Sequence, residues 1–113
     1  MRVSLFVTIF AFAGLAQNAP GQAAGDAAAG GEKTAMCAGC HGITGWRTVY
    51  PEIYSVPMIA GQHQAYIIKA LQAYRSGERS HPSMRAIASS LTDADMANLA
   101  AFYGSPSTAV AAK

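Results

Sequence analysis

The chain has 113 residues, of which 51% are apolar and only 12% are charged, and its formal net charge is +2. This length suits a single domain with a small core. The near balance of charge, with no basic arm or cluster, excludes nucleic-acid binding, which needs a concentrated positive face.

The first 23 residues have the pattern of a secretory signal peptide. A basic start at Arg2 precedes an apolar stretch over residues 3–16, which is shorter than the about 20 apolar residues of a membrane span. Small residues allow cleavage after Ala16 or after Ala23. We therefore expect an exported, periplasmic protein that does not span the membrane once the leader (1–23) is removed. Its domain occupies residues 24–104 and is followed by a flexible tail over 105–113.

Residues 23–37 are rich in alanine and favour a helix, with the pair Gly30-Gly31 as its weak point. This helix leads into Cys37-Ala38-Gly39-Cys40-His41. The pattern C-x-x-C-H is the covalent attachment signature of c-type haem. Two thiols three positions apart on one helical turn can each add across one haem vinyl group, and the following histidine can bind the iron.

Other sites built on C-x-x-C use fewer of these residues. A thioredoxin-like redox pair needs a βαβ context, and this chain has few strand signals. A structural zinc site needs four ligands, but a second C-x-x-C or a spaced histidine pair is missing. A disulfide between Cys37 and Cys40 is the simplest alternative. The adjacent His41 and the signal peptide favour one covalent haem, which would also complete the core of a domain of about 90 residues.

The middle of the chain is predicted to contain a loop and then a helix. Residues 42–57 hold glycines, prolines and aromatics without a helical period, which is typical of a loop. Residues 62–76 give the clearest helical pattern. Apolar side chains recur there at i, i+3, i+4 and i+7, at Ile67, Ala70, Leu71 and Tyr74. Ser76-Gly77 ends this helix.

The last third of the chain begins with a polar segment over residues 78–84 and a short helix over 85–90. Thr92 and Asp95 then have the spacing of a capping box, which predicts the start of the last helix. That helix runs to about Tyr103, where Gly104-Ser105-Pro106 stops it.

A haem iron held by His41 has a second axial position, for which several residues compete. Met96 lies inside the last predicted helix, where core packing is the expected role. Met58 follows His41 too closely, and His63 is expected at the surface or as a cap. Met84 lies in a loop beyond a complete helix, so its unbranched thioether is best placed to reach the iron. His81, three residues earlier, is the alternative ligand.

Five blocks of sequence in a fixed order resemble the class I cytochromes c, and above all the small monohaem cytochromes of bacteria and single halves of their dihaem relatives. These blocks are residues 37–42, 56–62, 66–79 with Met84, 91–95 and 99–103. The resemblance covers the whole mature chain. It implies an all-α fold of about four helices around one covalently bound haem, in which the first and last helices cross.

The resemblance also implies roles for individual residues. Cys37 and Cys40 match the thioether positions, His41 the proximal ligand and Met84 the distal ligand. Pro57 matches a proline whose carbonyl accepts a hydrogen bond from the proximal imidazole, although an ordinary loop breaker is equally expected there. The chain departs from the family between residues 44 and 54. Aromatic side chains there are expected to cover the haem edge.

These expectations describe a one-electron carrier and not an enzyme. Its partners would be a redox donor and a redox acceptor, bound transiently by a monomer through a small patch. Two alternatives stay open. One is a haem subunit of a periplasmic dehydrogenase complex, which a sizeable exposed apolar patch would favour. The other is a haem enzyme with an open distal site, against which Met84 argues.

Overall fold

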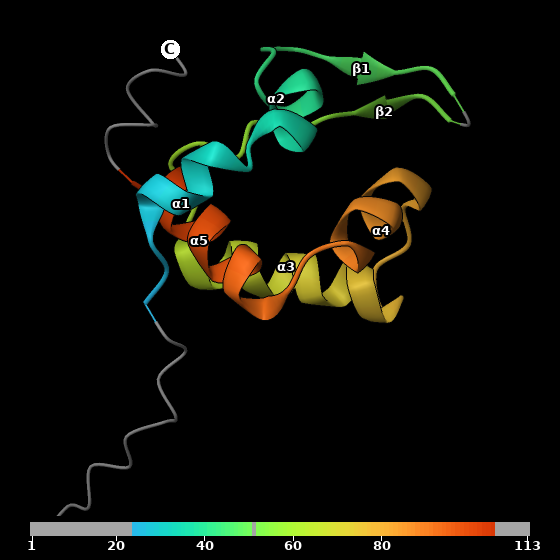
Figure 1. The fold of residues 1–113 in the computed structure, drawn as a ribbon. Helices are drawn as coiled ribbons and strands as arrows, with labels where there is room; N and C mark the ends of the chain where they lie inside the picture. The colour runs from blue at the N-terminus through green and yellow to red at the C-terminus, as the bar shows by residue number, and fades with distance from the viewer. Residues whose placement is uncertain (1–23, 51, 106–113) are drawn as a thin grey trace, which may run out of the picture.

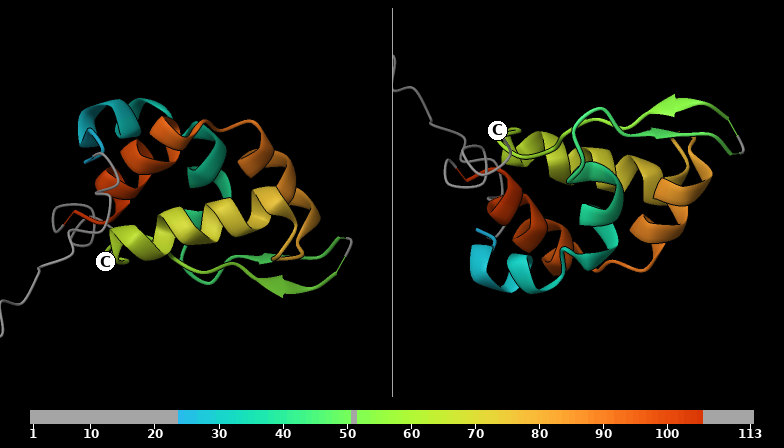
Figure 2. Two further views of the ribbon diagram at one scale, coloured as in Figure 1. Left: turned by 90° about the horizontal axis from the view of Figure 1, so that it is seen from below. Right: turned by 90° about the horizontal axis from the view of Figure 1, so that it is seen from above.

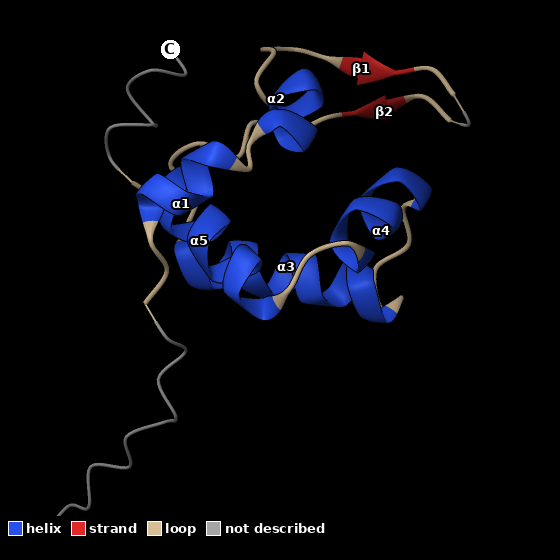
Figure 3. Ribbon diagram, in the orientation of Figure 1, coloured by secondary structure: helices blue, strands red, loops and turns tan. Residues whose placement is uncertain are grey.

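The structure, a computed structural model, describes residues 24–50 and 52–105; the predicted signal peptide and residues 106–113 of the predicted tail lie outside this part. The described residues form mostly helix, with one small antiparallel sheet (Figures 1 and 3). The elements in chain order are α1 (Ala27–Glu32), α2 (Ala35–His41), β1 (Arg47–Thr48), β2 (Tyr54–Ser55), α3 (Gln64–Ser76), α4 (Pro82–Ser89) and α5 (Asp93–Tyr103). The predicted helical class is confirmed.

The helix predicted over residues 23–37 is in fact two short helices, so that prediction was wrong. Helix α1 begins at Asp26, whose carboxylate accepts the N–H groups of Ala28 and Ala29 at 2.8 and 3.3 Å. It ends at Lys33, and the hydroxyl of Thr34 donates to the carbonyl of Gly31 at 2.9 Å. These local bonds satisfy backbone N–H and carbonyl groups at the two ends of α1. The chain can therefore turn before the C-x-x-C-H segment.

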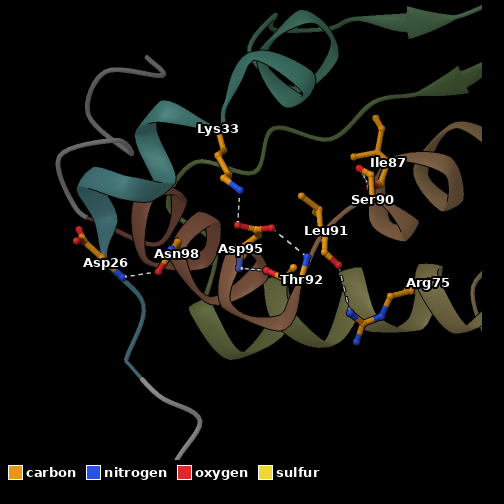
Figure 4. Close-up of polar contacts among 9 residues, drawn as sticks. All are labelled: Asp26, Lys33, Arg75, Ile87, Ser90, Leu91, Thr92, Asp95 and Asn98. Carbon is orange, nitrogen blue, oxygen red and sulfur yellow. Dashed lines mark hydrogen bonds and ion pairs between the residues drawn. The ribbon is translucent and has the colours of Figure 1, made fainter.

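Helices α1 and α5 cross in close contact, as the resemblance implied. A Cβ atom at Gly30 would lie 2.1 Å from the carbonyl oxygen of Asn98, so only glycine permits this approach. Two polar contacts flank the crossing (Figure 4). The Asp26 N–H donates to Oδ1 of Asn98 at 2.8 Å, and Nζ of Lys33 lies 2.5 Å from Oδ1 of Asp95. Gly30, one of the two glycines identified as a weak point of the helix, is thus the residue that lets α1 approach the backbone of α5.

Helix α5 forms the centre of the core, between α1 and α3 (Figure 2). Its side chains are buried on most sides, because α1, α3 and the segment after α4 all pack near it. The buried core residues are Ile67, Ile68, Ala88, Leu91, Met96, Leu99, Ala100 and Tyr103. Met96 is 0% exposed and belongs to the core, as expected for a packing residue.

The predicted end of α3 and the predicted start of α5 are both confirmed. Helix α3 ends at Gly77, whose φ of 86° is left-handed and therefore favours glycine. Helix α5 begins with the predicted capping box: Asp95 N–H donates to the Thr92 hydroxyl at 3.1 Å, and Thr92 N–H donates to the Asp95 carboxylate at 3.0 Å. Arg75 then ties α3 to the start of α5 through Asp93, at 2.6 Å.

The segment predicted as a loop contains a β-hairpin. Arg47 lies opposite Ser55 and Thr48 opposite Tyr54, in an antiparallel register. The N–H of Val56 donates to the carbonyl of Trp46 at 2.9 Å and extends the pairing by one step. The prediction of a loop without strands was therefore wrong for these residues. No helix in the described part of the chain is long and apolar enough to cross a bilayer.

Candidate haem-binding site

Helix α2 carries all three residues of the C-x-x-C-H motif in its last turns. Residues three or four positions apart share one face of a helix, so Cys37 lies near both Cys40 and His41. Cys37 and His41 are partly buried and Cys40 is exposed. Both cysteines are free thiols, so the disulfide alternative is not what the structure contains. The two thiols and the imidazole are therefore available together.

The imidazole of His41 is held by a backbone carbonyl. Its Nδ1 lies 2.6 Å from the carbonyl oxygen of Pro57, sixteen residues further along the chain. A carbonyl oxygen only accepts, so Nδ1 carries the proton and Nε2 keeps its lone pair. Nε2 is the nitrogen left free for a metal, and a ligand histidine bonded in this way has a fixed ring orientation and a stronger donor nitrogen. Pro57 is therefore in position for the role that the resemblance implied.

The Cys37 thiol is in contact with the core and with the hydroxyl of Tyr103 at the end of α5. Burial raises the pKa of Cys37, although the hydrogen bond with Tyr103 acts in the opposite direction. Burial and the neighbouring Cys37 raise the pKa of Tyr103 to about 12. Both groups are therefore neutral at neutral pH, and Cys37 is an uncharged thiol and not a reactive thiolate.

Helix α4 carries the two candidates for the second axial position. Pro82 occupies its first turn, as proline does at helix starts, and His81 is its N-cap residue. Nδ1 of His81 accepts the backbone N–H of Met84 at 3.3 Å. Met84 therefore lies in the first helical turn and not in a loop, and the predicted helix start at residue 85 was three residues late. The side chain of Met84 is partly buried.

The side chain of His81 makes two contacts. Besides capping α4, its ring packs edge-to-face on the ring of Tyr54 in β2, with centroids 5.1 Å apart. This ring contact joins the hairpin to the start of α4. His63 is exposed and precedes α3 without a side-chain cap bond, while Met58 is partly buried beside Pro57. Met84 is thus the candidate thioether on α4, with a capping histidine beside it.

Figure 1 shows α2 and α4 as separate helices on the same side of α3, with the hairpin running from one toward the other. In the part of the chain that the structure describes, the hydrogen bond of His41 goes to Pro57 and not to Met84. The donor set consists of two free thiols, one oriented imidazole and one thioether, which fits covalent haem. Among the described residues, no three His, Cys, Asp or Glu side chains are grouped to hold a metal ion, so the zinc alternative gains no support.

Three contacts around the site had no signal in the sequence. Tyr103 reaches Cys37 across 66 positions, Tyr54 packs on His81, and Lys33 pairs with Asp95. Each joins residues far apart in the chain, so only the packing of the helices brings them together. A capping role for His81 could have been read from the proline that follows it.

The family model for cytochrome c matches residues 23–105 of the chain. Cytochrome c4 of Pseudomonas aeruginosa is 37% identical over 108 residues, which are 96% of this chain and 49% of that protein. Cytochrome c-554(548) of Halomonas halodenitrificans is 41% identical over 85 residues, which are 73% of this chain and 98% of that protein. Cytochrome c-552 of Acidithiobacillus ferridurans is 36% identical over 103 residues, 88% of this chain and 43% of that protein.

The chain spans about half the length of the cytochrome c4 relatives that it matches. It therefore resembles one half of a dihaem cytochrome, as well as a whole small cytochrome. Cytochromes c bind haem covalently through C-x-x-C-H and are, as a class, electron-transfer proteins and not enzymes. The motif at Cys37, Cys40 and His41, the crossed terminal helices and the match over residues 23–105 lead to one conclusion: the chain belongs to the cytochrome c family.

Proposed function

We propose that the protein is a periplasmic one-electron carrier with one covalently attached, His/Met-ligated haem c. The observation that carries this proposal is the C-x-x-C-H helix with its imidazole held by Pro57 at 2.6 Å. The bond to the backbone fixes the ring and its tautomer, as is usual for a histidine that binds a metal. Here one nitrogen is bonded and the other is left as a ligand.

Four side chains would hold the cofactor. Cys37 and Cys40 form the thioethers, His41 is the proximal ligand and Met84 is the distal ligand. When bound, the haem supplies a one-electron couple between Fe(II) and Fe(III), and a thioether ligand favours the reduced form. Family membership supports the covalent haem, and the position of Met84 on α4 supports the choice of distal ligand.

The chain's own contribution is to keep both ligands fixed. Pro57 fixes the ring of His41, and the N-cap bond from His81 fixes the first turn of α4, on which Met84 lies. The ring of Tyr54 against His81 holds the hairpin to this turn. Ligands that are anchored in this way move little, which favours fast electron exchange. Donor and acceptor proteins would bind transiently at a small surface, without nucleic acid as a partner.

The proposed location is supported by the sequence of the first 23 residues. Their apolar stretch supports export, with cleavage after Ala16 or Ala23, a domain over residues 24–104 and a tail over 105–113. The N-terminal sequence and intact mass of protein from a periplasmic fraction test this proposal. A mature chain that starts at residue 17 or 24, with the mass of one haem added, supports it. A retained Met1 in a membrane fraction contradicts it.

The electron-carrier proposal is tested by a reversible optical redox titration of the purified protein. We expect a single one-electron transition and no spectral change when carbon monoxide is added to the reduced form, because both axial positions are filled. Rapid binding of carbon monoxide would contradict the His/Met ligation and favour an open distal site.

A second candidate is a haem subunit of a periplasmic dehydrogenase complex. The specific observation in its favour is the hairpin, on which Val49, Tyr50 and Ile53 are 81%, 86% and 69% exposed. An apolar patch of this kind is typical of a protein interface. Purification under mild conditions distinguishes the two candidates, since a subunit would copurify with a stoichiometric enzyme and a free carrier would not.

A further inference from the structure

The ring of Tyr54 joins the β-hairpin to the start of helix α4. It packs on the ring of His81 with centroids 5.1 Å apart and an interplanar angle of 72°, which is the edge-to-face geometry that aromatic pairs favour. Tyr54 lies in β2, opposite Thr48 of β1. It is 47% exposed, so it is not a core residue whose loss would leave a closed cavity. The contact therefore fixes two elements relative to each other and does not complete the core.

His81 passes this restraint on to the helix that carries Met84. Its Nδ1 accepts the backbone N–H of Met84 at 3.3 Å. A ring nitrogen that accepts a hydrogen bond carries no proton, so the proton of the neutral ring lies on Nε2. A histidine that binds a metal through Nε2 instead keeps its proton on Nδ1. Capping and ligation by His81 therefore exclude each other, and the cap bond favours a supporting role for His81 beside Met84.

The same hairpin also reaches the proximal side of the site. The carbonyl oxygen of Pro57, three residues after Tyr54, lies 2.6 Å from Nδ1 of His41. The segment over residues 54–57 therefore contacts α4 through Tyr54 and α2 through Pro57. Figure 1 shows the hairpin extending from α2 toward α4. A single short segment thus holds the two helices that carry the candidate axial ligands.

We propose that Tyr54 is a positioning residue for the distal ligand, and that its ring, acting through His81, determines how readily a small external ligand displaces Met84. The proposal rests on the proposed ligation by Met84. A thioether carries no charge, so its bond to the iron depends on how well the helix holds it in place. Removal of the Tyr54 ring frees His81 and loosens the first turn of α4.

Imidazole titration of the oxidised, haem-loaded protein tests this role. The added imidazole competes with Met84 for the iron, and the midpoint is read from the loss of the near-infrared sulfur-to-iron band. We expect the midpoint to fall by about threefold to tenfold in Tyr54→Ala, which is the value of one aromatic pair. Tyr54→Phe keeps the ring and therefore the wild-type midpoint. Tyr66→Ala is the matched control and also keeps it, because Tyr66 is 52% exposed but lies on α3.

A double-variant cycle tests whether Tyr54 acts through His81. His81→Asn keeps an N-cap for the N–H of Met84 but removes the ring that Tyr54 contacts. Tyr54→Ala should therefore lower the midpoint in the wild type but cause no further change in His81→Asn. A loosening of the hairpin at Pro57 would instead act on the proximal side, and it would lower the midpoint in both backgrounds.

Either of two results overturns the role of Tyr54 alone. Equal midpoints in Tyr54→Ala and Tyr54→Phe would remove the role of the ring and leave the His/Met ligation intact. An undiminished effect of Tyr54→Ala in the His81→Asn background would show that Tyr54 does not act through His81. A wild type without the sulfur-to-iron band is a different outcome, because it contradicts the ligation by Met84 and overturns this role with it.

Discussion

Nδ1 of His41 and the carbonyl oxygen of Pro57 lie 2.6 Å apart, although sixteen residues and a β-hairpin separate them in the chain. The hairpin explains how they meet. It carries the chain away from α2 and, through the pairing of Val56 with Trp46, returns it beside its starting point. A segment that leaves and returns in this way delivers the carbonyl of Pro57 to the imidazole. The orientation of the His41 ring is therefore set by the pairing of two short strands.

The first prediction concerns the proton on this imidazole. In the reduced, diamagnetic protein we expect one histidine Nδ1–H resonance that exchanges slowly with water, because the proton lies in a bond to the Pro57 carbonyl. Nuclear Overhauser contacts from this proton should reach the protons of Pro57 and Met58. A His41 ring whose Nδ1 carries no proton would contradict the assigned tautomer.

The second prediction identifies the distal ligand by comparing three methionines. Met84→Leu conserves most of the side-chain volume but removes the sulfur, so the weak near-infrared sulfur-to-iron band of the oxidised protein should disappear. Met58→Leu and Met96→Leu keep the band. Met96 is fully buried, so its variant is expected to lose up to about 1.5 kcal/mol of stability without a change in the spectrum.

His81→Asn completes this comparison. Asparagine is a good N-cap residue, so it can still accept the N–H of Met84 and keep α4 in place. If Met84 is the ligand, His81→Asn retains the sulfur-to-iron band. Loss of the wild-type spectrum in His81→Asn, together with its survival in Met84→Leu, would transfer the ligand role to His81.

The third prediction tests the contact between the crossed helices. Gly30→Ala drives a methyl group into the backbone carbonyl of Asn98, where neither partner is a flexible side chain. We expect a loss of about 2 kcal/mol or more in the free energy of unfolding, measured by denaturant titration. Gly31→Ala is the matched control. Its added Cβ would meet only the ring of Phe102, at 3.1 Å, and that ring can shift.

If Gly31→Ala destabilised the protein as much as Gly30→Ala, a general effect on α1 would explain the loss better than the crossing. Alanine is the better helix former at both positions, so propensity alone predicts a gain for each.

The fourth prediction concerns stability in acid. Hydrogen bonds from Lys33 and from Thr92 lower the pKa of Asp95 to about 2, from its ordinary 3.8. The folded state thus keeps this carboxylate charged where the unfolded chain already binds a proton. Its contribution to stability is fully present above about pH 4 and is lost as the pH falls toward 2. Asp95→Asn keeps an oxygen for the Thr92 N–H but removes the charge.

Melting temperatures measured between pH 5 and pH 2 test this prediction. The loss of stability with falling pH should be smaller in Asp95→Asn than in the wild type, and the two curves should converge at the acid end. Asp93→Asn removes the exposed partner of Arg75 and serves as the control. It retains the acid-dependent loss due to Asp95. Parallel curves for wild type and Asp95→Asn would rule out the Lys33 contact as its source.

Local signals in the sequence predicted the elements whose ends are determined by local bonds. The left-handed Gly77 at the end of α3 and the Thr92 capping box of α5 both depend on neighbours within a few positions. The C-x-x-C-H motif is local in the same sense, so the proximal side of the site could be predicted. Its occupancy by haem follows from the family, and the distal ligand stays a prediction.

Three expectations about the secondary structure were wrong, each for a local reason. Thr34 bonds back to Gly31 and breaks the first helix, although nothing in an alanine-rich segment marks that break. The strands of the hairpin are two residues long, which is too short for alternation to be detected. The start of α4 was missed because Pro82 was read as part of a loop, while proline also suits a first helical turn.

The crossing of α1 and α5 also has a consequence for the order of events during biosynthesis. Asp26 and Asn98 are 72 positions apart, and the core surrounds the last helix of the domain. Until α5 has been synthesised, α1 has no surface to pack on and the core lacks its centre. The chain therefore remains open while it is being made. In this open chain the thiol of Cys37 is accessible, and it becomes partly buried only when α5 brings Tyr103 beside it.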